Sequence, residues 1–244
     1  MPSNIHFAMG GAIFGAFTTE SMSLIAKHGL PGVEPYRGGL IAWLHKPQAL
    51  KNLLDEHGIR LITASNGGPG QSMAFIDPSK RRQTIADHVD FCRGFLKIFG
   101  CTHFKINMGS RPQNGTTVDD IKAIAETVLE LGQRTLEMGV TIAPHPHIWG
   151  PIERPEEVRA LLDQTDPDIV SWIPDTAQLN LGGGDPLQLI DITTTDWPLF
   201  TGRTRRHRIA VMRARHRRKR CTQRKSCTKI WDPVGLTTLR FGPC

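Results

Sequence analysis

Two histidines separated by a single residue are the strongest candidates for chemistry in this sequence. His145 and His147 end the apolar run that begins at residue 140. Along an extended strand, residues two apart point to the same face, so both imidazoles should lie on one side. Imidazole binds zinc, iron, nickel or copper, and a carboxylate oxygen also accepts manganese and magnesium. Asp175 ends the next apolar run and could add an oxygen ligand, so we expect at least one of the two histidines to bind a metal ion there. Alternatively, one histidine binds metal or substrate and the other is a hydrogen-bonded wall.

Polar residues end the earlier apolar runs as well. Glu34, Asn66, Lys105 and Asn107 stand at or near the ends of these runs. A buried carboxylate without a partner is costly, so Glu34 either acts on a ligand or forms a structural ion pair with Arg37 or Lys105. Lys105 likewise either holds an anionic or polyhydroxylated substrate or balances the charge of Glu34. We expect Glu34 and His147 to be catalytic, and Lys105 and Asn107 to contact the substrate.

The apolar runs and the amphipathic segments between them predict alternating strands and helices. Pro78 suits a first helical turn, and Gly100 suits a C-terminal cap. Strands are expected at residues 5–9, 32–35, 60–64, 103–108, 140–143 and 169–174, and helices at residues 19–28, 47–57, 77–99, 117–138 and 155–164. Strands joined by crossover helices require a mainly parallel sheet.

About six such units could form a doubly wound sheet or a (β/α)8 barrel. A dinucleotide site in a doubly wound sheet expects a G-x-G-x-x-G turn and a later acidic residue. Gly10, Gly11 and Gly15 approach this turn, but no acid follows at the right distance. In a barrel the chemistry lies at the carboxyl ends of the strands, which is where the polar residues occur here. The sequence therefore predicts a (β/α)8 TIM barrel over residues 1–200.

A run of three glycines at residues 182–184 has two interpretations. It could cradle a phosphate, but three glycines alone are weak grounds for that role. The following Asp185 and Pro186 are typical of a helix start. We expect a plain loop that leads into a helix.

The charge distribution divides the chain near residue 200. Residues 1–200 contain 16 Lys and Arg against 22 Asp and Glu, a net charge of −6, whereas residues 201–244 contain 14 Lys and Arg against Asp232 alone, a net charge of +13. No apolar stretch approaches the roughly 18 residues of a membrane span, and the first residues lack the features of a secretory signal. We expect no membrane association, a cytoplasmic location, and all five cysteines as free thiols.

The motifs after residue 140 resemble the xylose isomerase-like TIM-barrel superfamily, the sugar phosphate isomerase/epimerase group, and its inosose dehydratase-like members above all. In those members a His-x-His strand end precedes an Asp-Thr-Gly-His strand end and a Gly-x-Asp-Pro loop. The resemblance runs in order from about residue 5 to residue 190. It is carried by His145-Pro146-His147, Glu153-Arg154-Pro155-Glu156-Glu157-Val158, Leu161-Leu162, Thr165-Asp166-Pro167, Pro174-Asp175-Thr176-Ala177-Gln178-Leu179 and Gly183-Gly184-Asp185-Pro186-Leu187.

The resemblance implies an enzyme that uses a divalent metal (Mn²⁺, Co²⁺, Zn²⁺ or Mg²⁺) and acts beside a carbonyl of a small polyhydroxylated or keto-sugar substrate. His145 falls where many relatives have a metal-binding Glu, Asp175 matches the family's Asp ligand, and His147 would face the substrate. Ala177 and Gln178 replace the usual Gly-His. Gln178 can hydrogen-bond a substrate, but it cannot shuttle protons near neutral pH as His can.

The family's last two strands, which carry a His ligand in a His-x-Lys-Asp motif and a Glu ligand, are not recognisable after residue 200. In the reading frame that starts at the third base of each codon, the codons of Trp231 and Asp232 must encode a glycine, because TGG followed by GAN always contains GGA. The codons of residues 226–239 then permit Leu-Tyr-Lys-Asn-Leu-Gly-Ser-Gly-Gly-Val-Asp-Tyr-Pro, which resembles the Leu-Gly-x-Gly-x-Val-Asp-Phe segment before the family's last strand. We expect residues 201–244 to be a disordered or frame-shifted segment that replaces strands seven and eight of an incomplete barrel.

The favoured function is isomerisation, epimerisation or dehydration by metal-assisted proton transfer, impaired in this chain because two expected ligands are absent. One alternative is a catalytically inactive barrel that serves as a binding module. Another is a nucleic-acid-binding or endonuclease-type barrel that uses the basic segment, since the superfamily includes abasic-site endonucleases. No aromatic residue for base stacking occurs between residues 201 and 230, so a nucleic-acid partner is not expected.

Overall fold

The computed structural model of the protein describes residues 8–189. The predicted first strand lies partly outside this range, at residues 5–7. The predicted domain boundary at residue 200 and the basic segment 201–244 lie outside it entirely. Within the described range, no helix is both long enough and apolar enough to cross a membrane.

Short strands alternate with longer helices along the described chain, as the sequence predicts. The strands are β1 (Met9–Gly10), β2 (Gly32–Glu34), β3 (Arg60–Leu61), β4 (His103–Ile106) and β5 (Thr141–Pro144), the α-helices are α1 (Thr19–Lys27), α2 (Pro47–Glu56), α3 (Arg81–Gly94), α4 (Val118–Leu136), α5 (Pro155–Leu162) and α6 (Thr176–Leu181), and the 3₁₀ helices are η1 (Gly11–Phe14), η2 (Arg37–Trp43), η3 (Pro78–Lys80) and η4 (Leu96–Phe99). A further helical stretch begins at residue 186, where Leu187 N donates a hydrogen bond of 2.9 Å to Asp185 Oδ1. The predicted helix start at Asp185 is therefore confirmed.

The paired strands of the described chain are parallel, and neighbours follow the order of the sequence. β2 lies between β1 and β3, and β4 pairs with β5. A parallel bridge between Ser65 and Lys105 connects the two groups of strands. A strand order without reversal is that of a barrel wall, whereas a doubly wound sheet reverses its order at a switch point. The strand order therefore favours the barrel.

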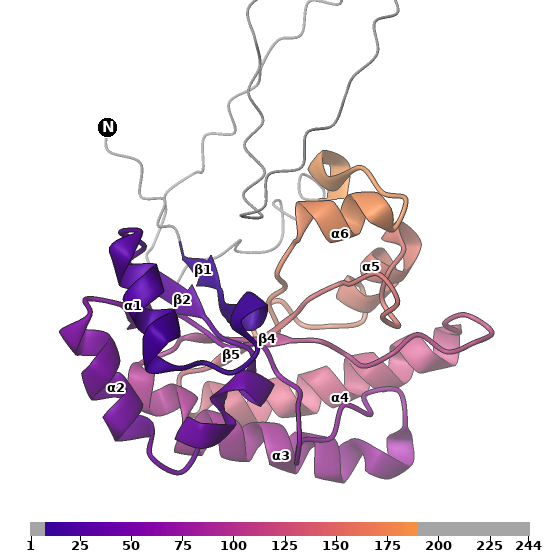
Figure 1. Ribbon diagram of the computed structural model, residues 1–244. Helices are drawn as coiled ribbons and strands as arrows, with labels where there is room; N and C mark the ends of the chain where they lie inside the picture. Colours follow the sequence, from indigo (N-terminus) through magenta and orange to yellow (C-terminus); the bar gives the residue numbers. More distant parts are fainter. Residues whose placement is uncertain (1–7, 190–244) are drawn as a thin grey trace, which may run out of the picture. The chain divides into compact units, whose positions relative to one another are not determined.

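Helices α1 to α4 form an outer layer beside the strands (Figure 1). The starts of two of them follow from local sequence. Thr18 and Thr117 are the N-caps of α1 and α4, and each forms a reciprocal capping box, with Ser21 and Asp120 respectively. Such boxes satisfy backbone N–H groups that have no partner within the first helical turn. The box at Thr117 fixes where α4 begins, and therefore how the chain returns from β4 to β5.

The single long helix predicted at residues 77–99 is interrupted. Phe95 separates α3 from η4 in a non-helical conformation, with φ −131° and ψ −70°. Its ring lies 5.1 Å from that of Phe91 and 4.8 Å from that of Phe99. The break allows Phe95 and the adjacent Leu96 both to be buried. Packing of aromatic side chains therefore overrides the helical pattern at this point.

The predicted sixth strand at residues 169–174 is not a regular strand. The segment lies parallel to β5 with a single bridge, at Val170. Ser171 N and Ile173 N each donate a hydrogen bond of 2.9 Å to a backbone carbonyl of β5. Pro144 has no N–H group to return a hydrogen bond, so the ladder cannot continue. The segment nevertheless occupies the position of the next strand in the wall.

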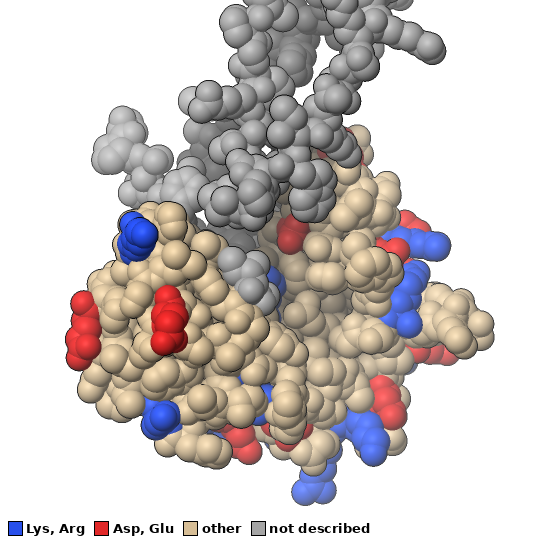
Figure 2. All heavy atoms as spheres, in the orientation of Figure 1, with Lys and Arg blue, Asp and Glu red and all other residues tan. Residues whose placement is uncertain are grey.

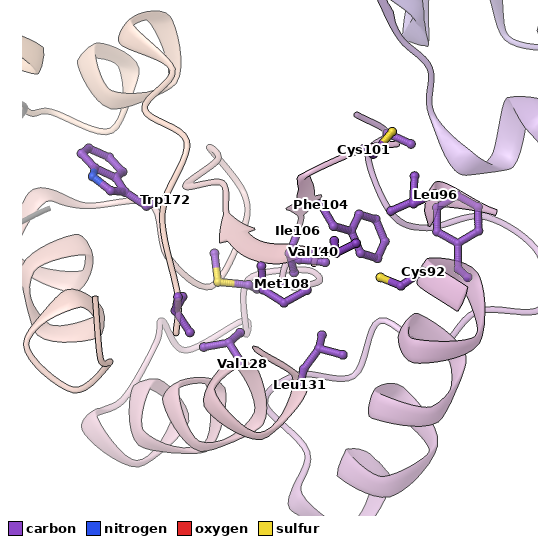
Figure 3. Packing of buried hydrophobic residues seen from close by; sticks show 14 of the residues in the cluster. Cys92, Leu96, Cys101, Phe104, Ile106, Met108, Val128, Leu131, Val140 and Trp172 are labelled. Carbon is purple, nitrogen blue, oxygen red and sulfur yellow. The ribbon is translucent and has the colours of Figure 1, made fainter. Parts of the chain in front are cut away.

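The core lies between the strands and the helices beside them, and Figure 3 shows the part around β4. Phe104 and Ile106 of β4 are fully buried, and Val128 and Leu131 of α4 are buried with them. Burial of each such side chain contributes about 1.5–3 kcal/mol. This packing holds β4 in place, and β4 in turn presents the polar residues at its carboxyl end.

Cys92 and Cys101 are free thiols, as predicted, and both are buried in this core. Burial disfavours the charged thiolate, so it raises the pKa of Cys92 and raises that of Cys101 to about 12. Thiols with such pKa values are poor nucleophiles near neutral pH. Neither thiol is therefore a candidate for chemistry. Cys221, Cys227 and Cys244, also predicted to be free, lie outside the described residues.

Basic and acidic side chains are interspersed over the face seen in Figure 2. Residues 8–189 hold 16 Lys and Arg and 20 Asp and Glu. The described part of this face therefore presents no continuous basic surface of the kind that neutralises a phosphate backbone.

Two buried polar side chains fix the backbone at the carboxyl end of β4. Asn66 Oδ1 accepts a hydrogen bond of 2.7 Å from Asn107 N, and Asn66 Nδ2 donates one of 2.9 Å to Asn107 O. Asn66 Nδ2 also lies 2.8 Å from Nε2 of His88, whose Nδ1 lies 2.7 Å from Thr84 O. A carbonyl only accepts, so Nδ1 of His88 carries the proton and Nε2 accepts from Asn66. The position of Asn107 thus depends on a neutral His88.

Burial lowers the pKa of His88 from 6.5 to about 4. Between these values the unfolded chain binds the proton that the folded chain excludes, so stability falls as pH falls through this window. We expect the wild-type protein to lose about 3 kcal/mol more than His88→Gln between pH 7 and pH 4. Urea unfolding at a series of pH values measures the difference. His45→Gln, at an exposed histidine, should keep the wild-type slope. Equal slopes for wild type and His88→Gln would contradict the prediction.

Gly132 of α4 lies against the segment that follows α5. A Cβ atom at this position would lie 2.8 Å from Ile169 Cγ2 and 3.1 Å from Ile169 O, whereas a Cβ atom at Gly94, the last residue of α3, would meet nothing within 4 Å. Two helical glycines thus differ in the space around them. Only the one on α4 is required by packing.

Gly132→Ala is expected to lower the free energy of unfolding by about 1–3 kcal/mol, because overpacking outweighs the gain in helix propensity. Gly94→Ala is the matched control, and it should be neutral or stabilising. Urea unfolding followed by circular dichroism measures both variants. If the two proved equally stable, α4 would not pack against Ile169 as described.

Candidate functional site

A cavity of about 330 Å³ opens at the carboxyl ends of β4 and β5. The register of these strands sets Ile106 opposite Pro144, so the residues that follow them meet at one edge of the wall. Three of the predicted site residues, Asn107, His145 and His147, line the cavity together. The remaining wall consists of Met108, Gly109, Ile148, Trp149, Gly150, Pro151 and Ile152.

His145 is buried and is held at the end of β5. Its backbone N–H donates to Ile106 O at 2.8 Å, and its Nδ1 lies 3.4 Å from Ile173 O. Burial, together with the positive charge of Lys105, lowers its pKa to about 4, and Asp175 partly opposes this change. The imidazole is therefore neutral near pH 7. With Nδ1 turned to a carbonyl, Nε2 keeps its lone pair for a ligand.

His147 lies on the same side of the chain as His145, as the spacing predicts. The two ring centroids are 5.7 Å apart, with an angle of 68° between the ring planes. His147 Nδ1 lies 2.6 Å from Ile148 O. Since that carbonyl only accepts, Nδ1 carries the proton and Nε2 is left as an acceptor. Both histidines thus offer Nε2 as a base or ligand atom.

Asn107 presents its side chain to the cavity while its backbone is fixed on both sides. The two hydrogen bonds to Asn66 hold its N–H and C=O groups. Its own carboxamide forms no hydrogen bond within residues 8–189. A fixed backbone with a free amide suits a residue that binds a ligand hydroxyl.

Glu34 of β2 and Lys105 of β4 form an ion pair across the segment after β3, which lies between them. Lys105 Nζ lies 2.8 Å from Glu34 Oε1, and Ser65 Oγ donates a hydrogen bond of 2.7 Å to the same oxygen. Of the two structural partners that the sequence suggests for Glu34, the structure has Lys105, whereas Arg37 donates to Pro69 O. Glu34 and Lys105 are not among the residues that line the cavity. Their predicted roles in catalysis and substrate binding remain predictions.

Asp175 is the N-cap of α6, a helix that the sequence did not predict. Its Oδ1 accepts hydrogen bonds from Ala177 N at 2.9 Å and from Gln178 N at 3.1 Å. The other carboxylate oxygen, Oδ2, has no partner within residues 8–189. Gln178 Oε1 accepts a hydrogen bond of 3.1 Å from Ile148 N, so this side chain holds the loop that follows β5. Its predicted contact with substrate remains a prediction.

The predicted metal ligands form at most a partial site in the described chain. Within residues 8–189, no three His, Cys, Asp or Glu side chains lie close enough together to hold a metal ion. A neutral imidazole on His145 and a free oxygen on Asp175 are suitable donors for a divalent ion. The two further ligands that the resemblance implies would come after residue 189, outside the described residues.

The loop at residues 148–154 forms much of the cavity wall, and sequence reasoning missed it. Trp149 adopts φ +63°, a left-handed conformation that costs roughly 1–2 kcal/mol for a residue with a side chain. The adjacent Gly150 is required by close approach, since a Cβ atom there would lie 2.9 Å from His147 O. Trp149 N donates to Glu153 Oε2 at 2.7 Å, and Trp149 O accepts from Arg111 N at 2.6 Å. The loop is thus held from both sides.

A buried ion pair anchors this loop. Arg111 binds Glu157 through two hydrogen bonds, of 2.9 and 2.6 Å. Glu157 also accepts hydrogen bonds from Glu153 N and Arg154 N, at 2.9 and 2.8 Å. Together these bonds hold the carboxylate in its charged form and lower its pKa, against the effect of burial. The acidic residues at 153–157 were a visible signal in the sequence, but their partner lies more than 40 residues earlier.

Solved structures share this fold. The chain aligns with a sugar phosphate isomerase/epimerase from Parabacteroides distasonis at a TM-score of 0.58 and 16% identity, over 81% of this chain and 77% of that one. It aligns with the IOLI protein, whose structure holds a zinc atom, at a TM-score of 0.61 and 17% identity, over 74% and 66% of the two chains. At such identities the similarity establishes the TIM-barrel fold.

Curated relatives are similar in sequence. An inosose dehydratase from Lacticaseibacillus casei is 36% identical over 157 residues, which are 59% of this chain and 50% of that enzyme. An inosose dehydratase from Geobacillus kaustophilus is 24% identical over 157 residues, 59% of this chain and 49% of that enzyme. The chain thus spans about half the length of the curated relatives that it matches.

The family profile described as xylose isomerase-like TIM barrel matches residues 22–227. The match covers all the strands from β2 onward and the cavity, and it continues past the charge boundary near residue 200. It includes most of the chain. The protein therefore belongs to the xylose isomerase-like TIM-barrel family, whose relatives are of the sugar isomerase, epimerase and dehydratase type.

Proposed function

We propose that this chain is built as a metal-dependent enzyme that transfers a proton beside a carbonyl of a small polyhydroxylated or keto-sugar substrate. The observation that carries the proposal is the pair of histidines, His145 and His147, on one cavity wall with both Nε2 atoms available. Inosose dehydratases among its relatives and a zinc-bound structural neighbour support it. The reaction would be isomerisation, epimerisation or dehydration.

In this proposal His145 and Asp175 bind the metal, and His147 accepts a proton from the substrate. A bound divalent ion supplies stabilisation of negative charge on the carbonyl oxygen. His147 suits a base because its Nδ1–H is fixed by Ile148 O, so its Nε2 lone pair faces one direction. Asn107 and Gln178 would both bind substrate hydroxyls.

Glu34 is already engaged by two hydrogen-bond donors in this arrangement. Its Oε1 already accepts hydrogen bonds from Lys105 and Ser65. We therefore propose that Glu34 and Lys105 form polar surface near the substrate. Proton transfer by Glu34 is the second possibility.

Activity is expected to be weak for the chain as written. The resemblance implies two further metal ligands, and neither is recognisable after residue 200. With an incomplete set of ligands the metal would be held loosely and the carbonyl polarised poorly. A catalytically inactive barrel that acts as a binding module is the second candidate. It is favoured because the two further metal ligands are not recognisable in the sequence.

Metal binding and turnover test the proposal on the full chain. Calorimetric titration with Mn²⁺, Co²⁺, Zn²⁺ and Mg²⁺ should give binding that falls at least about tenfold in His145→Ala, since one of few ligands is lost. His45→Ala, at an exposed histidine, is the matched control and should bind like the wild type. Assays with inososes, ketoses and hydroxypyruvate should give slow turnover that a chelator abolishes. Metal binding unaffected by His145→Ala would contradict the assigned ligand.

Turnover also separates the two candidate functions. Tight metal binding with turnover of any of these substrates would exclude the inactive barrel. Binding of a substrate without turnover, at every metal tested, would favour the binding module.

The coding DNA for residues 190–244 tests the frame-shifted segment directly. We expect reading from the third base to continue without a stop codon through the peptide that resembles the approach to the family's last strand. Sequencing of the gene from an independent clone measures this. A stop codon in that frame, or codons that exclude the peptide, would contradict the proposal and leave the basic segment as a genuine extension.

A further inference from the structure

We infer that Trp149 is a stacking platform for the C–H face of an uncharged polyhydroxylated ligand bound in the cavity beside His145 and His147. The inference rests on the proposed function and adds to it the residue that orients the ligand and the charge class of that ligand. It begins from the conformation and exposure of Trp149.

Trp149 lines the cavity and is nevertheless 75% exposed. Large aromatic side chains gain stability from burial, so an exposed one at the mouth of a cavity has area to offer a ligand. Within residues 8–189 it is also the one residue other than glycine with a positive φ. Strain of this kind persists where the surrounding structure enforces it, and it is concentrated at ligand sites.

The surrounding structure does enforce this conformation. The N–H group of Trp149 is held by Glu153 and its C=O group by the backbone of Arg111. Arg111 is in turn fixed to the buried carboxylate of Glu157. The indole is therefore carried on a rigid loop, which reduces the entropy lost when a ligand stacks on it.

The cavity lining supplies hydrogen-bonding groups without formal charge. None of the described lining residues is Lys, Arg, Asp or Glu. Asn107 and the two imidazole Nε2 atoms can bind hydroxyl and carbonyl groups. A phosphate group would lack a positive partner among these residues. Hydroxyls on one edge of a sugar or cyclitol and C–H groups on its face match this arrangement.

Two basic groups near the cavity are already paired. Lys105 is bound to Glu34, and Arg111 is bound to Glu157. Lys105 or Arg111 could bind an anion only by breaking its ion pair. Both members of each pair are largely shielded from water. A nucleic-acid strand stacked on Trp149 would bring phosphates to a rim where Glu153 holds the loop. The charge distribution thus favours the neutral polyol over a nucleotide.

Ligand NMR and calorimetry on the full chain test the inference without requiring turnover. The probes are an inosose, D-fructose and D-fructose 6-phosphate. We expect the inosose to bind wild type with its C–H protons shifted upfield by the indole ring, and to bind Trp149→Ala about tenfold more weakly, a typical loss for one aromatic stacking contact. Trp149→Gly should lose binding to the same extent. Glycine accepts a φ of +63°, so this variant removes the ring while relieving the backbone strain.

Trp43→Phe is the matched control. Trp43 donates a hydrogen bond to Phe17 O and lies outside the cavity, so its replacement should leave inosose binding unchanged. Binding of the inosose that is equal in wild type, Trp149→Ala and Trp149→Gly would overturn the platform while leaving the proposed function intact. Tighter binding of the phosphorylated ketose, or of an oligonucleotide with an abasic site, would overturn the uncharged ligand. Failure of wild type to bind any polyol would instead overturn the proposed function itself.

Discussion

The parallel register between β4 and β5 is the constraint on which the site depends. Four consecutive residue pairs, from His103 with Thr141 to Ile106 with Pro144, align the carboxyl ends of the two strands. Asn107 and His145 follow at the same level, and His145 N donates to Ile106 O as the ladder ends. Because side chains alternate along a strand, a slip of one residue would turn both histidines away from the cavity. Burial of Phe104 against His88 and Phe91 of α3 opposes such a slip.

Much of this could be predicted from the sequence because the signals are local. Alternating apolar runs and amphipathic segments identify β2 and α4 closely, and the spacing of His145 and His147 predicts that they share a face. The end of the parallel hydrogen-bond ladder beyond Val170 could not be predicted in this way. It depends on Pro144 in the neighbouring strand, which has no N–H group to donate. The pattern of apolar residues in one strand does not show which residues of its partner lack a donor.

The parts that could not be predicted depend on contacts between distant residues. Glu34 lies 71 positions from Lys105, with which it pairs, and the sequence offered Arg37 as an equal candidate. The left-handed conformation of Trp149 depends on Arg111 and Glu157, which lie 46 positions apart. Residue type gives no warning here, since a positive φ is usually occupied by glycine or asparagine. Long-range pairing thus decided whether a charge was free for chemistry or already neutralised.

The short helix α6 connects Asp175 with the loop that carries Trp149. Asp175 caps it with one carboxylate oxygen, and Gln178, three residues later, binds the backbone of Ile148 beside Trp149. The oxygen of Asp175 that remains free is the one available to a metal ion. Any ligand that draws Asp175 toward the cavity would pull on the N-terminal turn of α6, and through Gln178 on the loop that carries the indole. The proposed metal ligand and the proposed stacking residue are therefore linked through the first turn of α6. That link gives a physical reason for Gln at position 178, since its side-chain carbonyl accepts the Ile148 N–H.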